Sequence, residues 1–277
     1  MKITKLVLPI AGRGVRLLPL TKRTPKNLIC VNGKPLLEYV LDEAVASGIK
    51  EVILVVNPDH RKRFDGYLRK NAKRFPALRF HVREQETPGG NGHAIVKAYD
   101  LLRGEPFAVR FCDDIVMTKR PVLLSLLQIF AAEKSPVLLL ERVPEKLVSR
   151  FGVVGIKKAT SDMRQATRKL GGKIYRVTKI VEKPKAKDAP SNLTIVGGYV
   201  LTPEIMNYLK MVADTLPVIA DDALPLAVAL QIELIVGGRV LGWEFPGKRL
   251  DCGTLEKLKK TEEFLKKSNC NSIETRW

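Results

Sequence analysis

The chain has 277 residues, and its 48 Lys and Arg against 29 Asp and Glu give a formal net charge of +19 at pH 7. Hydrophobic residues make up 45% of the sequence and charged residues 28%. This balance can fill a globular core, and it argues against a disordered, collagenous or coiled-coil chain. The length fits one large α/β domain with appendages as well as two smaller domains.

The cysteines and the N-terminal segment indicate in which cellular compartment the protein is expected. The four cysteines lie far apart and form no Cys-x-x-Cys pair, which argues against a zinc site and a disulfide framework and fits a reducing environment. The first apolar run is of strand length, too short for the core of a signal peptide or for a membrane span. We therefore expect a cytoplasmic protein with no membrane partner.

The positive charge is spread along the chain, since residues 1–138 hold 24 of the 48 basic residues. The richest stretch, His60–Arg83, contains nine basic residues and one acid. Its spacing is typical of a solvated helix face with Tyr67 and Leu68 turned inward. Because no nucleic-acid-binding motif accompanies the charge, we interpret the stretch as a basic surface and expect no nucleic-acid partner.

Near the start of the chain, a helical segment lies between two segments with the pattern of buried strands. The segments Ile3–Ile10 and Glu51–Asn57 are mainly apolar and of strand length. Between them, Leu36–Ser47 repeats apolar residues at helical spacing, and Gly48 follows as a C-cap. This order predicts a βαβ unit, the element of a doubly wound parallel sheet.

The alternation of strands and helices continues along the chain. Further strands are predicted at Arg79–Val82, Pro106–Phe111 and Val137–Glu141, and helices at His93–Leu102, Leu123–Glu133 and Leu255–Lys267. Between Phe151 and Leu201 the pattern becomes shorter and more β-like. The sequence therefore predicts an α/β fold, with a Rossmann-like, mixed and largely parallel sheet flanked by helices and a smaller β-rich part.

The loop after the first strand contains Gly12 and Gly14 but is neither a dinucleotide nor a Walker signature, because Leu17 stands where a third glycine is needed. A near match to a phosphate loop at Gly242–Arg249 lacks the hydroxyl residue that would hold magnesium, and we interpret it as chance. The first loop can still bring its backbone close to phosphates.

Several segments together resemble the sugar-1-phosphate nucleotidylyltransferases, over nearly the whole chain. The segment from Val181 is the most specific match. The matching segments are GRGVRLLPLTKRTPKNLICVNGKPLLEYVL (Gly12–Leu41), REQETPGGNGHA (Arg83–Ala94), FCDDIV (Phe111–Val116), FGVV (Phe151–Val154), VEKPKAKDAPSNLTIVGGYVL (Val181–Leu201) and LDCGT (Leu250–Thr254).

The resemblance implies a nucleotidyltransferase (GT-A-like) fold that converts a nucleoside triphosphate and a sugar 1-phosphate into a nucleotide sugar and pyrophosphate. The segments GHA and VEKPKA…APSN are closer to the uridylyl branch, which implies UTP and glucose 1-phosphate as substrates. The family also implies a homodimer or homotetramer. We expect one domain over residues 1–277, with a mainly nucleotide-binding part at 1–140, a mainly sugar-phosphate-binding part at 141–254 and a C-terminal helix at 255–277.

Four residues are expected to handle the phosphates and the metal. Asp113 follows a predicted strand, at the carboxyl end where open α/β sheets bind ligands. By resemblance, Asp113 and Asp251 hold Mg²⁺ through carboxylate oxygens while phosphates complete its shell. Arg16 resembles the arginine that steadies the β- and γ-phosphates, and Lys26 the lysine that reaches the phosphates.

Asp114, next to Asp113, is left out of the predicted metal site because its side chain would point elsewhere on an extended strand. His93 is expected to order its loop or cap a helix, because a phosphate nucleophile is already ionised and needs no general base.

The substrate-binding residues are also implied by the resemblance. The family's nucleotide-contacting positions correspond to Ala11, Gly12, Gly14, Gln85 and Gly90. Gln85 suits the edge of a pyrimidine, because an amide both donates and accepts hydrogen bonds. On the sugar side, Glu182 accepts from hydroxyl groups, Lys183 pairs with the sugar phosphate and acts as a catalytic residue, and Gly152 offers its backbone.

Two departures from the family pattern leave alternatives open. Val15 replaces the usual Thr, and the segment Ala220–Ala227 has lost polar positions. The same chemistry with dTTP, as in thymidylyltransferases, is one alternative, and a non-catalytic regulatory module is another. The joint presence of the expected phosphate and metal residues argues against the second.

Overall fold

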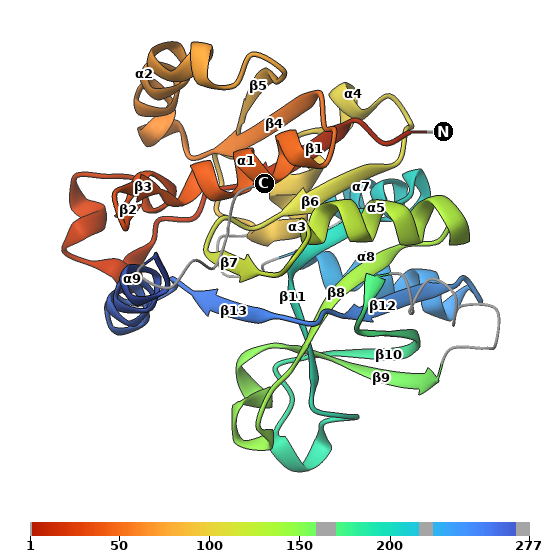
Figure 1. Cartoon of the computed structure of the whole chain (residues 1–277). Coiled ribbons are helices and arrows are strands. Elements are labelled where there is room, and N and C mark those ends of the chain that lie inside the picture. Colours follow the sequence, from red (N-terminus) through yellow and green to blue (C-terminus); the bar gives the residue numbers. More distant parts are fainter. Residues whose placement is uncertain (1, 159–169, 216–223, 270–277) are drawn as a thin grey trace.

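The computed structural model describes residues 2–158, 170–215 and 224–269 (Figure 1). A nine-stranded sheet forms its centre, in the order β5-β4-β1-β6-β11-β8-β12-β10-β9. Its strands in chain order are β1 (Lys5–Pro9), β4 (Glu51–Val56), β5 (Arg79–Glu84), β6 (Phe107–Arg110), β8 (Val137–Arg142), β9 (Gly152–Lys158), β10 (Lys173–Glu182), β11 (Leu193–Leu201) and β12 (Val240–Glu244).

Helices cover both faces of this sheet (Figure 1). One face carries α1 (Leu36–Ala46), α2 (Arg61–Asn71) and α5 (Val122–Glu133), and the other carries α3 (Gly90–Val96), α4 (Tyr99–Leu102), α7 (Pro203–Thr215) and α8 (Leu226–Ile235). Two separate apolar clusters fill these interfaces, because the side chains of each strand alternate between the faces. The expected α/β fold, with a sheet flanked by helices, is confirmed.

The sheet is mixed, as predicted, but it is less parallel than predicted. β5, β4, β1 and β6 pair in parallel, as do β8 and β12. The other neighbours, β6–β11, β11–β8, β12–β10 and β10–β9, are antiparallel. Of these antiparallel pairs, only β9–β10 joins consecutive strands, and the others join strands that are separated in the chain.

Most predicted elements form within one to three residues of their expected bounds. Gly48, at φ 77°, ends α1 in the left-handed conformation that glycine adopts without a steric cost. The single helix predicted at His93–Leu102 is wrong, because α3 and α4 are separate. At their junction, Lys97 and Ala98 donate to carbonyls three residues back, which ends the α-helical pattern.

A smaller layer lies beside the main sheet and carries part of the site. It contains two-stranded sheets and a long helix, whose apolar side chains form a third cluster with those of the loop after β1. The elements are β2 (Cys30–Val31), β3 (Lys34–Pro35), β7 (Asp114–Met117), β13 (Lys248–Asp251) and α9 (Leu255–Asn269).

The first part of the basic stretch His60–Arg83 forms helix α2, as predicted, but the stretch ends in strand β5. Phe64 is fully buried against the sheet, and Tyr67 and Leu68 are partly buried there. The basic side chains of Lys62, Arg63, Arg69 and Lys70 are exposed. In the described ranges, no helix combines the length and apolar character needed to cross a membrane.

Some sequence features lie wholly or partly outside the described residues. These are Cys270 and most of the altered segment Ala220–Ala227, of which only residues 224–227 are described. Cys30, Cys112 and Cys252 are free thiols.

A buried ion pair joins the sheet to the helices on one face. Arg110, at the end of β6, is 1% exposed, and its Nε donates to Glu43 of α1 at 3.0 Å. Glu43 also accepts from the backbone N–H of Leu123 at 2.8 Å, and Arg110 Nη1 donates to the carbonyl of Gly197 in β11 at 2.8 Å. The pair therefore ties together β6, α1, α5 and β11.

We predict that Glu43→Ala lowers the free energy of unfolding by about 3 to 5 kcal/mol, because it leaves the Arg110 guanidinium buried without its carboxylate. Asp214→Ala removes the exposed Lys210–Asp214 pair and serves as the control, with an expected loss below about 0.5 kcal/mol. Urea unfolding followed by circular dichroism measures both. Equal losses would contradict a special role for the buried pair.

Candidate active site

Two adjoining cavities open where β1 and β6 end. The larger has a volume of about 690 Å³ and the smaller about 260 Å³. Both are lined by Arg16, Asn91, Phe111 and Asp113. They therefore form one continuous depression at the carboxyl ends of the parallel strands, the expected place for a ligand in an open α/β sheet.

The glycine loop forms one wall of the smaller cavity, through Gly12, Gly14 and Arg16. Gly14 has φ 66°, and a Cβ there would lie 2.9 Å from Thr21 Cγ2, so the close approach of the loop to Thr21 requires glycine. The guanidinium of Arg16 lies beside Gly253, within 3.6 Å of the position that a Cβ would take there. Arg16 thus faces the residues that follow β13.

The two predicted metal ligands come together through the pairing of β7 with β13. Asp114 is opposite Asp251 in this ladder, and Cys252 N–H donates to the carbonyl of Asp113 at 2.8 Å. Both Asp113 and Asp251 line the larger cavity. Segments almost 140 residues apart in the sequence are held side by side at the site by this ladder.

A lysine neutralises each of the two carboxylates. Lys26 Nζ lies 2.6 Å from Asp113 Oδ2, and Lys257 of α9 pairs with Asp251. Burial alone would raise the pKa of Asp251, but the hydrogen bonds from Lys257 and from the backbone N–H of Gly253 outweigh it and lower that pKa. Asp251 is therefore ionised at neutral pH.

The donor set at Asp113 and Asp251 fits a hard divalent cation such as Mg²⁺, which takes carboxylate oxygens and commonly completes its shell with phosphate and water. Among the described residues, no group of three or more His, Cys, Asp and Glu could hold a metal ion. The fit therefore depends on phosphate oxygens from a substrate.

Asp114 and Arg249, which the sequence analysis set aside, form a buried ion pair in the wall of the larger cavity. Arg249 Nη1 donates to Asp114 at 3.0 Å, and its Nε donates to Glu141 of β8 at 2.6 Å. Asp114 also accepts from the backbone N–H of Gly197 at 3.2 Å. Burial and the charge of Asp113 raise the pKa of Asp114, and the ion pair with Arg249 opposes this shift.

Asp114 therefore pairs with Arg249, whereas Asp113 pairs with Lys26, and both aspartates line the larger cavity. Arg249 also stacks over the ring of Phe151, with 4.8 Å between the guanidinium carbon and the ring centroid. The β7–β13 ladder is the feature that would have revealed the pair, and no local pattern in the sequence predicts it.

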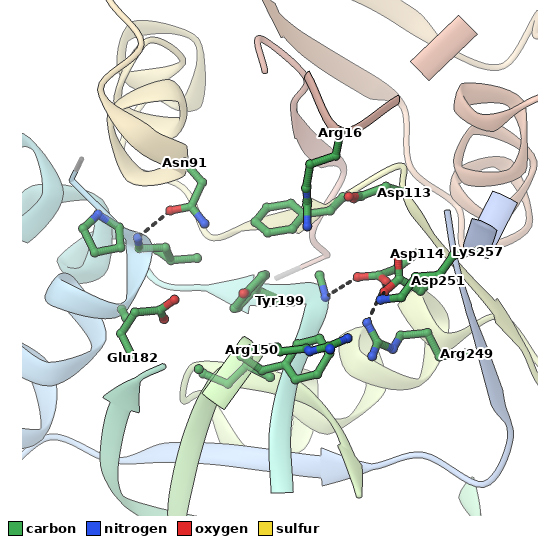
Figure 2. A pocket seen from close by; sticks show the side chains of 18 of the residues that line it. Arg16, Asn91, Asp113, Asp114, Arg150, Glu182, Tyr199, Arg249, Asp251 and Lys257 are labelled. Carbon is green, nitrogen blue, oxygen red and sulfur yellow. Dashed lines mark hydrogen bonds and ion pairs between the residues drawn. The ribbon is translucent and has the colours of Figure 1, made fainter. Parts of the chain in front are cut away.

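The predicted sugar side lies across the same cavity (Figure 2). Gly152 of β9 is paired with Glu182 of β10, and a Cβ at Gly152 would lie 3.0 Å from Glu182 Oε2. Both residues line the larger cavity. Lys183 does not line it, because the chain turns there at φ 45° and its side chain is 66% exposed, with Nζ 3.8 Å from Glu182.

The predicted base-reading residues Gln85, which is buried, and Gly90, which is half-buried, lie in one hydrogen-bonded group with His93. Gln85 Nε2 donates to the carbonyl of Gly90 at 3.0 Å and lies 3.1 Å from His93 Nδ1. Desolvation by burial and the nearby Lys97 lower the pKa of His93, so its ring is neutral at pH 7 and can accept from the Gln85 amide.

His93 therefore orders its loop, in line with the sequence interpretation. Gln85 and Gly90 do not line either cavity, and neither does Ala11, which is buried at the end of β1.

Asn91 is an additional residue that the sequence analysis did not select. It lines both cavities, and its Oδ1 accepts from the backbone N–H of Leu226 at the start of α8 at 2.8 Å. The start of helix α3 is thereby fastened to the start of α8, whose Leu226 also lines the larger cavity.

The family model described as "Nucleotidyl transferase" matches residues 5–267. The chain belongs to the nucleotidyl transferase family. It is 35% identical over 270 residues to the UTP–glucose-1-phosphate uridylyltransferase of Bacillus subtilis (strain 168), covering 91% of this chain and 87% of that protein.

Solved structures of the family share the fold over almost the whole chain. A UDP-glucose pyrophosphorylase complexed with UDP-glucose superimposes with a TM-score of 0.82 at 28% identity, covering 96% of this chain and 99% of that one. A UTP-bound enzyme of the same kind from Acinetobacter baumannii has a TM-score of 0.76 at 26% identity, covering 98% and 100%. The family predicted from the sequence motifs is confirmed.

Proposed function

We propose that the chain catalyses the transfer of a uridylyl group from UTP to glucose 1-phosphate, giving UDP-glucose and pyrophosphate. The observation that carries the proposal is the larger cavity, which brings Arg16, the aspartates Asp113 and Asp251, and the predicted sugar residues Gly152 and Glu182 into one space. The names of the similar proteins, and the UDP-glucose and UTP bound in two similar structures, support the choice of substrates.

The reaction is an in-line displacement at the α-phosphorus of UTP. A phosphate oxygen of glucose 1-phosphate forms the new bond to phosphorus, and the bond from phosphorus to the bridging oxygen of pyrophosphate breaks. The attacking phosphate is already ionised at neutral pH, so no general base is required. The protein's task is to hold two anions in contact and to stabilise the charge that develops on pyrophosphate.

We assign this charge stabilisation to Arg16 and Lys26, which line the smaller cavity on the glycine-loop side. Asp113 and Asp251 would hold Mg²⁺, which supplies positive charge against the phosphates when bound. The backbone at Gly12 and Gly14 can approach the nucleotide closely.

The remaining assignments follow the family pattern. Gln85 and Gly90 read the base, with Ala11 beneath the nucleotide, and Glu182 accepts hydrogen bonds from the sugar hydroxyls. Lys183 stays assigned to the sugar phosphate, from a position outside the cavity lining. The same proposal includes a cytoplasmic location and a homodimer or homotetramer. It also includes the division of the chain at residues 140 and 254 into a nucleotide-binding part, a sugar-phosphate-binding part and a C-terminal helix.

Asp113→Asn is expected to abolish turnover while the protein stays folded, because the loss of one carboxylate charge weakens the hold on the metal. The measurement is magnesium-dependent release of pyrophosphate from UTP and glucose 1-phosphate, with circular dichroism as the check on folding. Asp59→Asn, at an exposed carboxylate away from both cavities, is the matched control and should keep full activity. Normal turnover in Asp113→Asn would refute the metal assignment.

Arg16→Ala should lower kcat on the order of 10²-fold, equivalent to about 2.7 kcal/mol of lost transition-state stabilisation. Steady-state kinetics with each substrate varied in turn separate the effects on kcat and KM. A rise in KM with unchanged kcat would mean that Arg16 binds the ground state and the transition state equally.

The base preference is expected to be steric, since uracil and thymine have the same hydrogen-bonding edge and differ by one methyl group. UTP should exceed dTTP in kcat/KM by roughly 10- to 200-fold. CTP should be rejected more strongly than dTTP, because its edge reverses a donor and an acceptor and leaves a buried partner unpaired. Purine nucleotides should fail because of their size.

Initial rates of pyrophosphate release with equal concentrations of UTP, dTTP, CTP, ATP and GTP measure this order. Faster reaction with dTTP would favour the thymidylyl alternative. No reaction with any pair of substrates would favour a non-catalytic regulatory module.

A further inference from the structure

The charged residues around the larger cavity differ in whether they already have a partner. Within the described part of the chain, Lys257 pairs with Asp251, and Arg249 pairs with Asp114 and Glu141. Arg16 and Arg150 line the same cavity and have no carboxylate or hydrogen-bonding partner among the described residues. Their positive charges are therefore available for a ligand.

The two unpartnered arginines approach from different walls. Figure 2 shows Arg16 entering from the glycine-loop side and Arg150 from the opposite side, between Glu182 and Arg249 in this view. The reaction brings together two anions, a nucleoside triphosphate and a sugar phosphate. With Arg16 on the nucleotide side, the second free guanidinium lies on the sugar side.

The wall around Arg150 runs from the metal aspartates to the sugar residues. Arg249, two residues before Asp251, stacks on Phe151, and Gly152 is paired with Glu182. Arg150 directly precedes Phe151 at the end of a 3₁₀ turn. A sugar 1-phosphate with its hydroxyls at Glu182 and its phosphate near the aspartates would pass along this wall, within the part of the cavity that Arg150 lines.

We propose that Arg150 binds the phosphate of the sugar 1-phosphate, the group that becomes the sugar-linked phosphate of the product. The inference rests on the proposed function and adds a second cation to the one expected at Lys183. The planar guanidinium suits this role, because it donates two parallel hydrogen bonds to phosphate oxygens and remains charged at all physiological pH values. Both Arg150 and Lys183 are exposed residues, but only Arg150 lines the cavity.

The test compares ligands that differ by the glucose 1-phosphate part, which contains the phosphate in question. UDP-glucose carries this part and UMP does not, so isothermal titration of each ligand isolates the contribution of the glucosyl phosphate as a whole. Arg150→Ala should weaken UDP-glucose binding roughly 10- to 100-fold, the usual effect of losing a charge-assisted hydrogen bond, and leave UMP binding within about twofold. Arg150→Lys should recover part of the loss, because it keeps the charge without the two-pronged geometry.

Arg176→Ala is the matched control, because Arg176 is an exposed arginine of β10 outside the cavity lining. In steady-state assays, Arg150→Ala should raise KM for glucose 1-phosphate about tenfold or more with little change in KM for UTP. The same measurements on Lys183→Ala compare the two cations directly.

Three results would overturn the proposal. In the first, Arg150→Ala loses no more affinity for UDP-glucose than Arg176→Ala does. In the second, Arg150→Ala loses affinity for UMP and for UDP-glucose equally. In the third, Lys183→Ala loses all affinity for UDP-glucose and Arg150→Ala loses none. Failure of the proposed function would be seen in the unmodified protein. That protein would bind UDP-glucose but release no pyrophosphate from UTP and glucose 1-phosphate.

Discussion

The ion pair between Asp114 and Arg249 is the interaction on which the geometry of the site depends. Both side chains are almost buried, at 12% and 10% exposed, so each charge requires its partner. Through this pair, β7 and β13 are fixed to each other and to Gly197 of β11. Because the predicted metal ligands flank the same ladder, its register sets how far apart their carboxylates stand.

The net charge of +19 and the charges of the site have different physical meanings. Most basic residues lie on exposed surfaces such as α2, where solvent and salt screen them. In the cavity, the carboxylates are matched by lysines or by Arg249, which leaves Arg16 and Arg150 without a partner among the described residues. A site of this kind attracts anions through a few positioned groups, whatever the total charge of the chain.

The change of strand direction in the sheet places these groups in one cavity. The parallel half presents the carboxyl ends of β1 and β6, with the glycine loop and Asp113 after them. β11 then pairs antiparallel with β6 and leads to the half that contains β9 and β10. The residues predicted for the nucleotide and those predicted for the sugar therefore meet where the two halves join, an arrangement that can hold two reactants close together.

The local sequence was enough to predict the first βαβ unit, the carboxyl-end position of Asp113 and the glycine loop, because buried strands and amphipathic helices leave periodic patterns over neighbouring residues. The motifs extended this to the family and to residues such as Glu182, which the structure brings to the cavity. The tertiary structure alone placed Asp114 against Arg249, which is 135 residues away, and turned Lys183 away from the cavity lining at a positive φ. Pairing across such a separation depends on how whole strands pack, and the direction of a side chain at a strand end depends on the backbone turn there. Neither leaves a periodic signal in the sequence.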